Sequence, residues 1–305
     1  MLNTAIRYFL EVVNCGSMTL AAQNLHVAPS AVSRMVRKLE DEHEVALFER
    51  HAKGIVLTEA GRMLADYARR TALDAERARL DISDLKQIGQ RLIRISANQA
   101  FGKELLPHII GRLRQTDPSL RFVVSVLQSS DINRRVREGE DDVGFCYGMA
   151  PAQGVHLLYS KPMPLYAIMA PDHPLATRET LTMREIASFP VALMGPGSTV
   201  RAVVDLCCMN EKVALDIALV SNNMGTVQSY CVEWGAVGFC GGYTVLSSLK
   251  RGEVVQVPLQ HAELHQRHLQ ILSMQGRELP ASVSRFVDAC VDYVERQPQW
   301  PALAQ

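Results

Sequence analysis

The sequence contains no long hydrophobic run and no excess of charge of either sign. No uninterrupted apolar stretch approaches the ~18 residues of a membrane-spanning helix. The 305 residues carry 32 basic and 32 acidic side chains, which argues against a protein that coats nucleic acid without specificity, so any DNA contact must be local. The first residues lack the basic start and apolar core of a signal peptide. We therefore expect a cytoplasmic protein that makes no contact with membranes.

The sequence also lacks paired cysteines and the common catalytic motifs. Its seven cysteines are odd in number and scattered, with no CxxC pair, which predicts reduced thiols rather than a disulfide framework. Cys207 and Cys208 are adjacent and can bridge only through a strained ring, so a redox switch is not expected there. No GxSxG elbow, phosphate-binding loop or HExxH is present. These absences predict no catalytic residues, no cofactor and no enzyme.

Three histidines near the end of the chain raise the question of a metal site. His261, His265 and His268 would share one face of a helix and could then bind zinc. The apolar residues Leu264 and 269–271 instead favour an extended segment, which would separate the three side chains. We therefore predict no metal site, and expect these histidines on the surface or at a hinge.

The most informative stretch is residues 28–40, which predicts a helix beginning at Pro29. Proline suits the first helical position, where its missing N–H has no partner to lose. Apolar residues recur at helical spacing and predict a buried face made of Ala31, Val32, Met35, Val36 and Leu39. Small hydroxyls and then cations occupy the remaining surface: Ser30, Ser33, Arg34, Arg37 and Lys38. The hydroxyls can lie close to base edges and the cations can reach phosphates, although a solvated helix face has the same composition.

Two further helices are predicted before this one. Residues 2–13 are apolar at helical spacing, and Gly16 is a typical residue for ending such a helix. Ser17 or Thr19 can cap a short second helix through residues 21–25. Two short helices joined by a short turn form a helix-turn-helix, whose second helix enters the major groove of DNA.

A two-stranded wing is predicted after the helix that begins at Pro29, which we call the reading helix. Residues 45–58 contain two short apolar runs separated by a polar turn at Lys53 and Gly54. Arg50 and Lys53 are candidates for contacts to the phosphates that flank the groove. Thr58 is placed to cap the helix that follows.

This N-terminal region resembles the LysR-type transcriptional regulators. The matching positions span residues 9–61 and are Phe9, Gly16-Ser17, Ala21-Ala22, Leu25, Ser30-Ala31-Val32-Ser33, Lys38-Leu39-Glu40, Leu47-Phe48-Glu49-Arg50 and Leu57-Thr58-Glu59-Ala60-Gly61. Two positions depart from the family pattern, because Glu44 stands where Gly usually ends the reading helix and Ala28 stands where a capping hydroxyl is common. The resemblance implies a winged helix-turn-helix DNA-binding domain over residues 1–58.

Reading this region as a winged helix-turn-helix lets us assign expected roles to individual residues from their chemistry. The helix that begins at Pro29 would enter the major groove, with Ser30 and Ser33 near the bases. Five cations would lie largely on phosphates: Arg34, Arg37, Lys38, Arg50 and Lys53.

A long helix is predicted next, because residues 59–88 contain no proline. Its small and apolar side chains recur about every 3.5 residues, a period that favours packing along a partner helix: Leu64, Ala68, Thr71, Ala75, Ala78, Ile82 and Leu85. Packing on its own domain is the alternative. The resemblance implies that residues 59–89 are a linker helix that pairs two subunits in a homodimer. Because the family usually forms tetramers, it also implies a homotetramer.

Strands and helices alternate in the rest of the chain. Strands are predicted at residues 92–97, 122–127, 143–146, 165–169, 191–194, 216–220, 237–240 and 269–272, with a closing helix at 280–293. This alternation predicts an α/β fold of parallel sheets covered by helices. The resemblance implies that residues 90–305 are an effector-binding domain of two lobes of periplasmic-binding-protein type. The first lobe would comprise residues 90–161 and 267–305, and the second residues 162–266.

Candidate ligand-binding residues follow from the rule that ligands bind beyond the carboxyl ends of strands in open α/β sheets. Ten polar residues stand at such positions: Asn98, Gln99, Gln128, Ser129, Ser130, Tyr147, Ser198, Thr199, Asn222 and Asn223. Each can equally well cap a helix. Hydroxyls and amides at helix starts favour a small anionic or zwitterionic effector, and Leu127, where the family often has Gly, would narrow the pocket.

These observations predict a regulator that binds double-stranded promoter DNA and is modulated by a small-molecule effector. RNA polymerase is a further partner that the resemblance leaves open. A solute-binding protein would share the two lobes but would need an export signal and no helix-turn-helix. An enzyme would need a nucleophile or paired carboxylates in the cleft, where the candidates are amides and hydroxyls.

Overall fold

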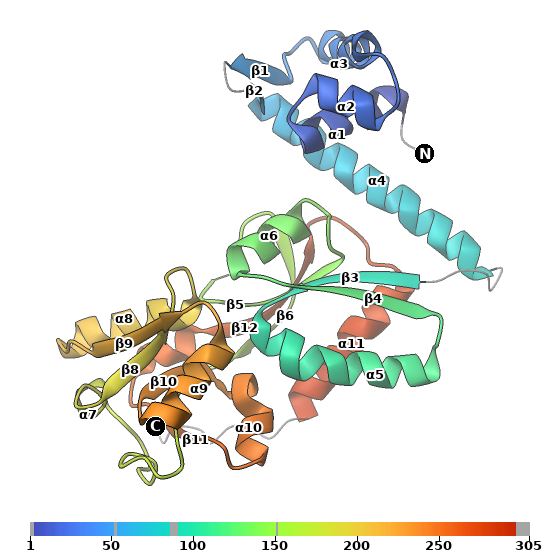
Figure 1. Ribbon diagram of the computed structural model, residues 1–305. Coiled ribbons are helices and arrows are strands. Elements are labelled where there is room, and N and C mark those ends of the chain that lie inside the picture. Colours follow the sequence, from blue (N-terminus) through green and yellow to red (C-terminus); the bar gives the residue numbers. More distant parts are fainter. Residues whose placement is uncertain (1–2, 52–53, 86–90, 151, 297–305) are drawn as a thin grey trace. The chain divides into compact units, whose positions relative to one another are not determined.

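The chain divides into two compact units, each with its own core. The computed structural model describes residues 3–51, 54–85, 91–150 and 152–296. One unit comprises residues 1–89 with 276–280, and the other residues 90–275 with 281–305 (Figure 1). None of the helices in these described ranges combines the length and the apolar character that crossing a membrane requires.

The N-terminal unit has the three helices and the wing that the sequence predicts. Its elements are α1 (Thr4–Cys15), α2 (Met18–Asn24), α3 (Pro29–His43), β1 (Phe48–His51), β2 (Gly54–Leu57) and α4 (Glu59–Leu85). The two strands pair antiparallel, with Phe48 opposite Leu57. The predicted helix boundaries are also confirmed: Gly16 ends α1 in the left-handed conformation, and Ser17 accepts a hydrogen bond from the N–H of Leu20 at the start of α2.

Apolar side chains from α1, α3 and the wing form the core of this unit. Val32, Val36 and Leu39 of α3 are buried as predicted, whereas Ala31 and Met35 are half-buried. Phe9 is fully buried and its ring centroid lies 5.3 Å from that of Phe48 in the wing. Each large buried side chain contributes about 1.5–3 kcal/mol, so this contact fixes α1 and the wing around the reading helix.

The two departures from the family pattern both lie at the ends of α3. Ala28 precedes the helix without a side-chain hydrogen bond to it. Glu44 ends the helix with φ of 52°, and its N–H donates to the carbonyl of Glu40. The helix therefore keeps its expected ends, but at a cost of about 1–2 kcal/mol for a left-handed residue that is not glycine.

The start of α4 is packed so closely on the wing that only glycine can occupy position 61. A Cβ atom on Gly61 would lie 2.0 Å from the backbone oxygen of Leu47 and 2.9 Å from a Leu57 methyl carbon. We expect Gly61→Ala to destabilise the N-terminal unit by about 1–3 kcal/mol, because backbone must shift. Urea unfolding of the purified variant measures this loss.

Gly111 is the matched control for this substitution. It lies exposed within a helix, and a Cβ atom there would have open space around it. Gly111→Ala should therefore stabilise its helix by about 0.5–1 kcal/mol. Equal effects at the two positions would contradict the close contact at Gly61.

The described residues of the second unit form two five-stranded sheets. The first has the order β4-β3-β5-β12-β6 and the second the order β11-β7-β10-β8-β9. The elements of the first sheet and its helices are β3 (Arg91–Ala97), η1 (Phe101–Leu105), α5 (Leu106–Thr116), β4 (Leu120–Val126), α6 (Ser129–Arg137), β5 (Val143–Gly148), β6 (Val155–Pro162), β12 (His268–Met274) and α11 (Ala281–Arg296). Those of the second are β7 (Leu165–Met169), α7 (Met183–Ile186), β8 (Pro190–Met194), α8 (Thr199–Glu211), β9 (Asp216–Ser221), α9 (Met224–Trp234), β10 (Val237–Gly241), η2 (Gly242–Val245), α10 (Leu246–Lys250), β11 (Val255–Pro258) and η3 (Ala262–Gln266).

The α/β prediction is confirmed, but the sheets are mixed rather than wholly parallel. β3 runs parallel to β4 and β5, and β8 runs parallel to β9 and β10. β12 is antiparallel to β5 and β6, and β7 is antiparallel to β10 and β11. The sequence did not predict β6 and β11, because these edge strands are half-exposed and lack a continuous apolar run.

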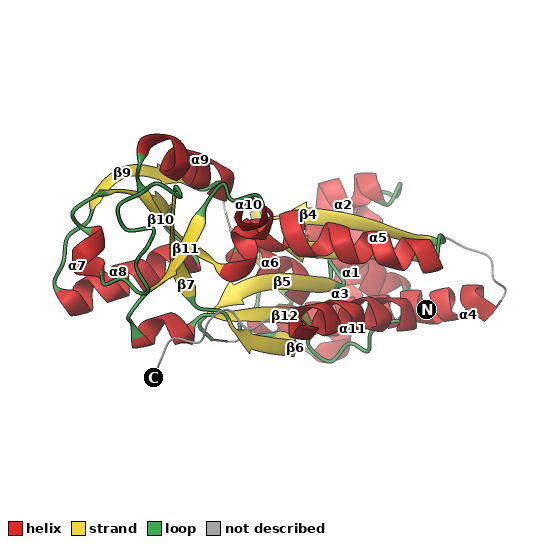
Figure 2. Ribbon diagram, turned by 90° about the horizontal axis from the view of Figure 1, so that it is seen from below, coloured by secondary structure: helices red, strands yellow, loops and turns green. Residues whose placement is uncertain are grey.

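Helices cover both faces of each sheet. In the first sheet α5 and α11 lie side by side on one face, and α6 covers the other (Figures 1 and 2). In β7, Leu165, Ala167 and Met169 pack toward α7 and α8, whereas Ile168 packs toward α9. The chain passes from the first sheet to the second between β6 and β7 and returns between η3 and β12.

Candidate functional site

The exposed face of α3 carries most of the predicted DNA-binding side chains. Pro29, Ser30, Arg34, Arg37 and Lys38 are exposed, and Ser33 is half-buried. Within the described residues Arg34 and Arg37 have no ion-pair partner, whereas Lys38 lies 3.7 Å from Glu42 in an exposed pair that contributes little. Two of the three cations are therefore exposed without an ion-pair partner among the described residues.

Two predicted DNA contacts cannot be placed. Arg50 belongs to β1, but its side chain is not among those that the structure describes. Lys53 lies outside the described residues.

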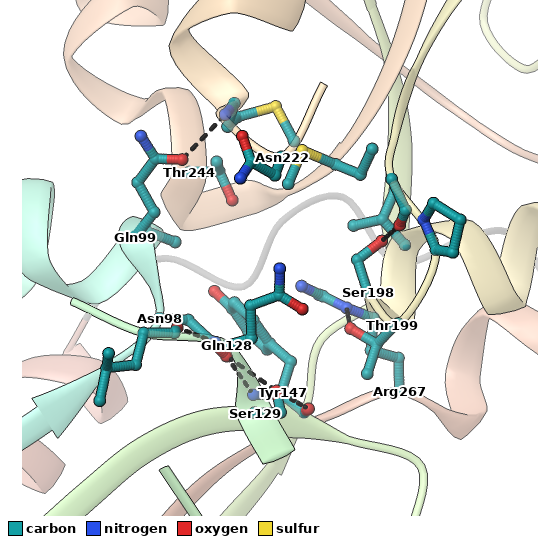
Figure 3. A pocket seen from close by; sticks show the side chains of 18 residues that line it. Asn98, Gln99, Gln128, Ser129, Tyr147, Ser198, Thr199, Asn222, Thr244 and Arg267 are labelled. Carbon is teal, nitrogen blue, oxygen red and sulfur yellow. Dashed lines mark hydrogen bonds between the residues drawn. The ribbon is translucent and has the colours of Figure 1, made fainter. Parts of the chain in front are cut away.

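A pocket lies between the two sheets of the second unit, with a cavity volume of about 110 Å³. The predicted residues that line it are Asn98, Gln99, Gln128, Ser129, Tyr147, Ser198, Thr199 and Asn222 (Figure 3). Ser130 and Asn223 are not among the lining residues. Ser130 lies in the first turn of α6, and Asn223 caps α9 by accepting a hydrogen bond of 3.2 Å from the N–H of Thr226. One water needs about 10–15 Å³ measured this way, so the pocket has room for a small metabolite.

Side chains at one wall of the pocket hold the strand ends of the first sheet together. Asn98 Nδ2 donates to the carbonyl of Leu127 at 3.0 Å, and its Oδ1 accepts from the N–H of Tyr147 at 2.9 Å. Ser129 Oγ donates to the carbonyl of Tyr147 at 3.1 Å. These two residues thus position the pocket wall through contacts that are already made within the chain.

Three helices begin at the pocket, and two of them have side-chain caps. Ser198 Oγ accepts from the N–H of Arg201 at the start of α8. Gln99 reaches from the first sheet to the second, and its Oε1 accepts from the N–H of Met224 in α9 at 2.8 Å (Figure 3). Gln128 precedes α6 without a side-chain cap. Helix N-termini carry partial positive charge, so the pocket favours an anion.

Arg267 is a charged residue of this pocket that the sequence prediction missed. It is 2% exposed, its Nε donates to Thr199 Oγ1 at 3.1 Å and its Nη1 donates to the carbonyl of Met163 at 3.0 Å. The guanidinium carbon lies 3.5 Å from the centre of the Tyr147 ring. No carboxylate among the described residues forms an ion pair with this guanidinium, so its charge is buried without a counter-ion. Burial lowers the pKa of Arg267, as expected for an unpaired cation.

Neighbouring residues leave space for this guanidinium and place further polar groups near it. A Cβ atom on Gly241 would lie 2.7 Å from Arg267 Nη1, so glycine makes room for the side chain. The Tyr147 hydroxyl is buried and makes no hydrogen bond of normal geometry with a described residue. Burial raises the pKa of Tyr147, so the hydroxyl stays protonated and can donate. Thr244 also lines the pocket.

The sequence prediction missed Arg267 because it considered only residues that follow the carboxyl ends of predicted strands. Arg267 directly precedes β12, the strand on which the chain returns from the second sheet. A charged residue before a strand is indistinguishable from an exposed loop residue until the pairing of that strand is known. An arginine directly before a largely apolar strand was an available signal.

Of the three histidines, His261 and His268 have described side chains, and each has hydrogen-bond partners of its own. Residues 262–266 form the 3-10 helix η3 rather than the extended segment that we expected, because Leu264 turns into the core. His268 Nδ1 lies 3.1 Å from the carbonyl of Gln266. His261 instead lies between Glu211 and Glu263, and the side chain of His265 is not described.

The neighbouring cysteines Cys207 and Cys208 both lie in α8. Cys207 is fully buried, and burial raises its pKa to about 12. Cys208 is half-buried. A protonated thiol is a poor nucleophile, and low reactivity of the two cysteines stays a prediction.

Comparison with known proteins identifies the family of this chain. Residues 4–62 match the model of the bacterial regulatory helix-turn-helix protein, lysR family, and residues 86–295 match the LysR substrate binding domain. An uncharacterized HTH-type transcriptional regulator of Escherichia coli, YeiE, is 31% identical over 289 residues, which are 93% of this chain and 95% of YeiE.

Solved structures share the fold along the whole chain. ArgP from Mycobacterium tuberculosis has a TM-score of 0.71 at 18% identity and covers 97% of this chain and 98% of its own. CbnR, solved in a complex with its target DNA, has a TM-score of 0.57 at 17% identity and covers 96% and 99%. The family models and the YeiE relative show family membership as well as fold. The chain therefore belongs to the LysR family and is a transcriptional regulator with a substrate-binding domain, not an enzyme.

Proposed function

We propose that this regulator binds double-stranded promoter DNA through α3 and is switched by a small anionic metabolite held between the two sheets of its substrate-binding domain. The observation that carries the effector proposal is the buried guanidinium of Arg267, which lines the pocket without a carboxylate partner. A buried charge is costly unless it is paired, and a bound anion would supply the missing partner.

The chemistry of the lining residues narrows the class of effector. Asn98, Gln99, Gln128, Ser129, Ser198, Thr199 and Asn222 would offer amides and hydroxyls around the anion. The described lining contains no aspartate or glutamate, so it offers no partner for the ammonium group of a zwitterion. A carboxylate can accept two hydrogen bonds from one guanidinium, and a phosphate can do the same. We therefore favour a small carboxylate or phosphate over an amino acid.

DNA binding would follow from the helix-turn-helix and from pairing of subunits. Pro29, Ser30 and Ser33 would lie against bases, and the cations of α3 against phosphates, with Arg50 and Lys53 of the wing beside them. A single helix-turn-helix makes few contacts, so a homodimer that binds two half-sites is the expected form. The solved complex of CbnR with its target DNA supports this mode for a related fold.

The linker helix α4 is the proposed dimer contact. Ala65 near its start packs on Ala5 and Phe9, so the alternative of packing on its own domain applies to that part. Ile82, farther along α4, is 58% exposed in the single chain and would gain a partner in a dimer. Pairs of dimers would form the tetramer, which would act on promoters in the cytoplasm, where RNA polymerase is a further partner.

Effector binding would control DNA binding through the relative energies of assembly states. A ligand shifts such an equilibrium only by as much as it prefers one state over another. An anion that joins the start of α6 on the first sheet to the start of α8 on the second would connect the two sheets, and so would favour one arrangement of the lobes.

A gel shift with the full-length protein tests this proposal. The probe is the DNA upstream of the gene that encodes the chain, with competitor DNA present, and a panel of small carboxylates and phosphates is added. We expect a specific complex whose affinity or mobility changes with at least one anion. A folded protein that binds the probe and is indifferent to every anion, while an amino acid shifts it, would contradict the proposed effector class.

A further inference from the structure

A cluster of potential metal ligands lies in the second sheet's half of the substrate-binding domain, apart from the effector pocket. The Sγ atom of Cys207, a ring nitrogen of His261 and a carboxylate oxygen of Glu263 all lie within 4.8 Å of one another. Cys207 comes from α8, whereas His261 and Glu263 come from the start of η3. Cys207 is fully buried, and the side chains of His261 and Glu263 are 11% and 21% exposed.

We propose that Cys207, His261 and Glu263 bind a divalent transition-metal ion, with Zn²⁺ as the best match to the donors. A thiolate, an imidazole and a carboxylate are the three ligand types that zinc takes in proteins. Hard cations such as Mg²⁺ and Ca²⁺ take oxygen ligands and would not use the cysteine. Water would occupy the fourth position of the ion.

The hydrogen bonds of His261 show how the cluster is satisfied without an ion. Its Nδ1 lies 2.7 Å from Glu263 Oε2, and its Nε2 lies 2.8 Å from Glu211 Oε1. A ring with a carboxylate at each nitrogen donates from both, and therefore carries two protons. Burial alone would lower the pKa of His261, but the hydrogen bonds and charges of Glu263 and Glu211 together raise it. A proton thus occupies the place between Nδ1 and Glu263 where the ion would bind.

Glu211 has the position of an outer hydrogen-bond partner. With an ion on Nδ1, the Nε2–H of His261 would still donate to Glu211, which is the usual support for a metal-bound histidine. Glu211 is itself held in place, because its two oxygens accept from the backbone N–H groups of Met183 and Arg184 at 3.0 and 3.1 Å. Asn210 likewise donates to the second oxygen of Glu263. The donors are therefore oriented before an ion arrives.

Binding requires a small rearrangement of the cluster and the loss of two protons. Zinc–sulfur and zinc–nitrogen bonds of about 2.3 and 2.0 Å place tetrahedral ligand atoms roughly 3.5 Å apart. Donor atoms separated by up to 4.8 Å must therefore approach one another, whereas His261 Nδ1 and Glu263 Oε2, now 2.7 Å apart, must separate slightly. The ion displaces the proton of the Cys207 thiol and the Nδ1 proton of His261, leaving thiolate and neutral imidazole as ligands. Affinity should consequently fall as the pH is lowered.

Metal titration of the full-length, reduced and chelator-treated protein tests the site. Calorimetry with Zn²⁺ in two buffers of different ionisation enthalpy should give one ion per chain and about two protons released. Co²⁺ should produce a thiolate charge-transfer band in the near ultraviolet. Glu211→Gln, which keeps one acceptor oxygen for α7, should weaken Zn²⁺ binding about 10–100-fold, and Cys207→Ser should weaken it further and remove the band.

Cys208→Ser is the matched control, because it removes the adjacent thiol of the same helix. It should leave the stoichiometry, the affinity and the cobalt band unchanged. Wild type that binds Zn²⁺ no more tightly than Cys207→Ser would overturn the proposal, as would loss of the band in Cys208→Ser. If Cys207→Ser does not fold, His261→Gln and Glu263→Gln decide: unchanged Zn²⁺ affinity in both would place the ion elsewhere.

Discussion

Arg267→Met is expected to abolish the response to an anionic effector without unfolding the protein. Methionine keeps much of the volume and the apolar contact with the Tyr147 ring, but removes the charge. Truncating one member of a buried charge pair costs about 2–5 kcal/mol of binding, which is roughly 30-fold to several thousand-fold in affinity. The measurement is calorimetric titration with the carboxylate or phosphate that alters the gel shift.

The stability of the same variant is the second part of this prediction. Losing the hydrogen bonds to Met163 and Thr199 destabilises the protein by about 0.5–1.5 kcal/mol each. Removing an unpaired buried charge stabilises it by a similar amount. We therefore expect a thermal midpoint close to that of wild type in the absence of effector.

Arg201→Met is the control for charge and for location. Arg201 lies in the first turn of α8, and its Nε donates to Asp205 at 2.8 Å outside the pocket. It should bind the effector with wild-type affinity. An Arg267→Met protein that binds the anion as tightly as wild type would show that the guanidinium does not face the ligand.

Arg34→Ala is expected to weaken DNA binding while leaving the homodimer intact. Arg34 is exposed in the middle of α3, and within the described residues it has no ion-pair partner to restrain it. A lost phosphate contact should lower affinity on all sequences and reduce the slope of log affinity against log salt by about one per contact. A gel shift measured over a range of salt concentrations gives both quantities, and sedimentation gives the state of assembly.

Arg69→Ala provides the comparison within the same unit. Arg69 lies on α4, and its guanidinium is 3.7 Å from Asp66. Removing it changes the net charge by the same amount but leaves α3 untouched, so DNA affinity and salt slope should stay close to wild type. If Arg34→Ala keeps full affinity at ~150 mM salt, where exposed charges are screened but still felt, α3 does not carry the contact.

Local sequence signals were sufficient for the N-terminal unit. Proline at the start of α3, glycine after α1 and Thr58 before α4 act through their own backbone or through the next turn of chain. Thr58 Oγ1, for example, accepts from the N–H of Gly61 at 3.0 Å, as its position predicts. Such bonds join residues only a few positions apart, so spacing alone identifies them.

The wall of the pocket between the two sheets was predictable in part. Strand ends identified Asn98 and Ser129 as pocket residues, but left open whether they cap a helix or contact a ligand. In the structure Asn98 joins three strand ends through contacts with Leu127 and Tyr147, which depends on the order of strands in the sheet. The order of strands depends on hydrogen bonding between distant segments, so no single segment of the sequence predicts it.

The sequence by itself determined the helix-turn-helix, the wing, the linker helix and the α/β alternation, because these follow from the periodicity of apolar residues and from local caps. The tertiary structure alone decided where Arg267 lies and which groups surround it, because its partners Met163 and Thr199 come from distant parts of the chain. It also brought His261 to Cys207 and Glu211 of α8. Burial and charge pairing act through space, so the chemistry of both sites appears only once the chain is folded.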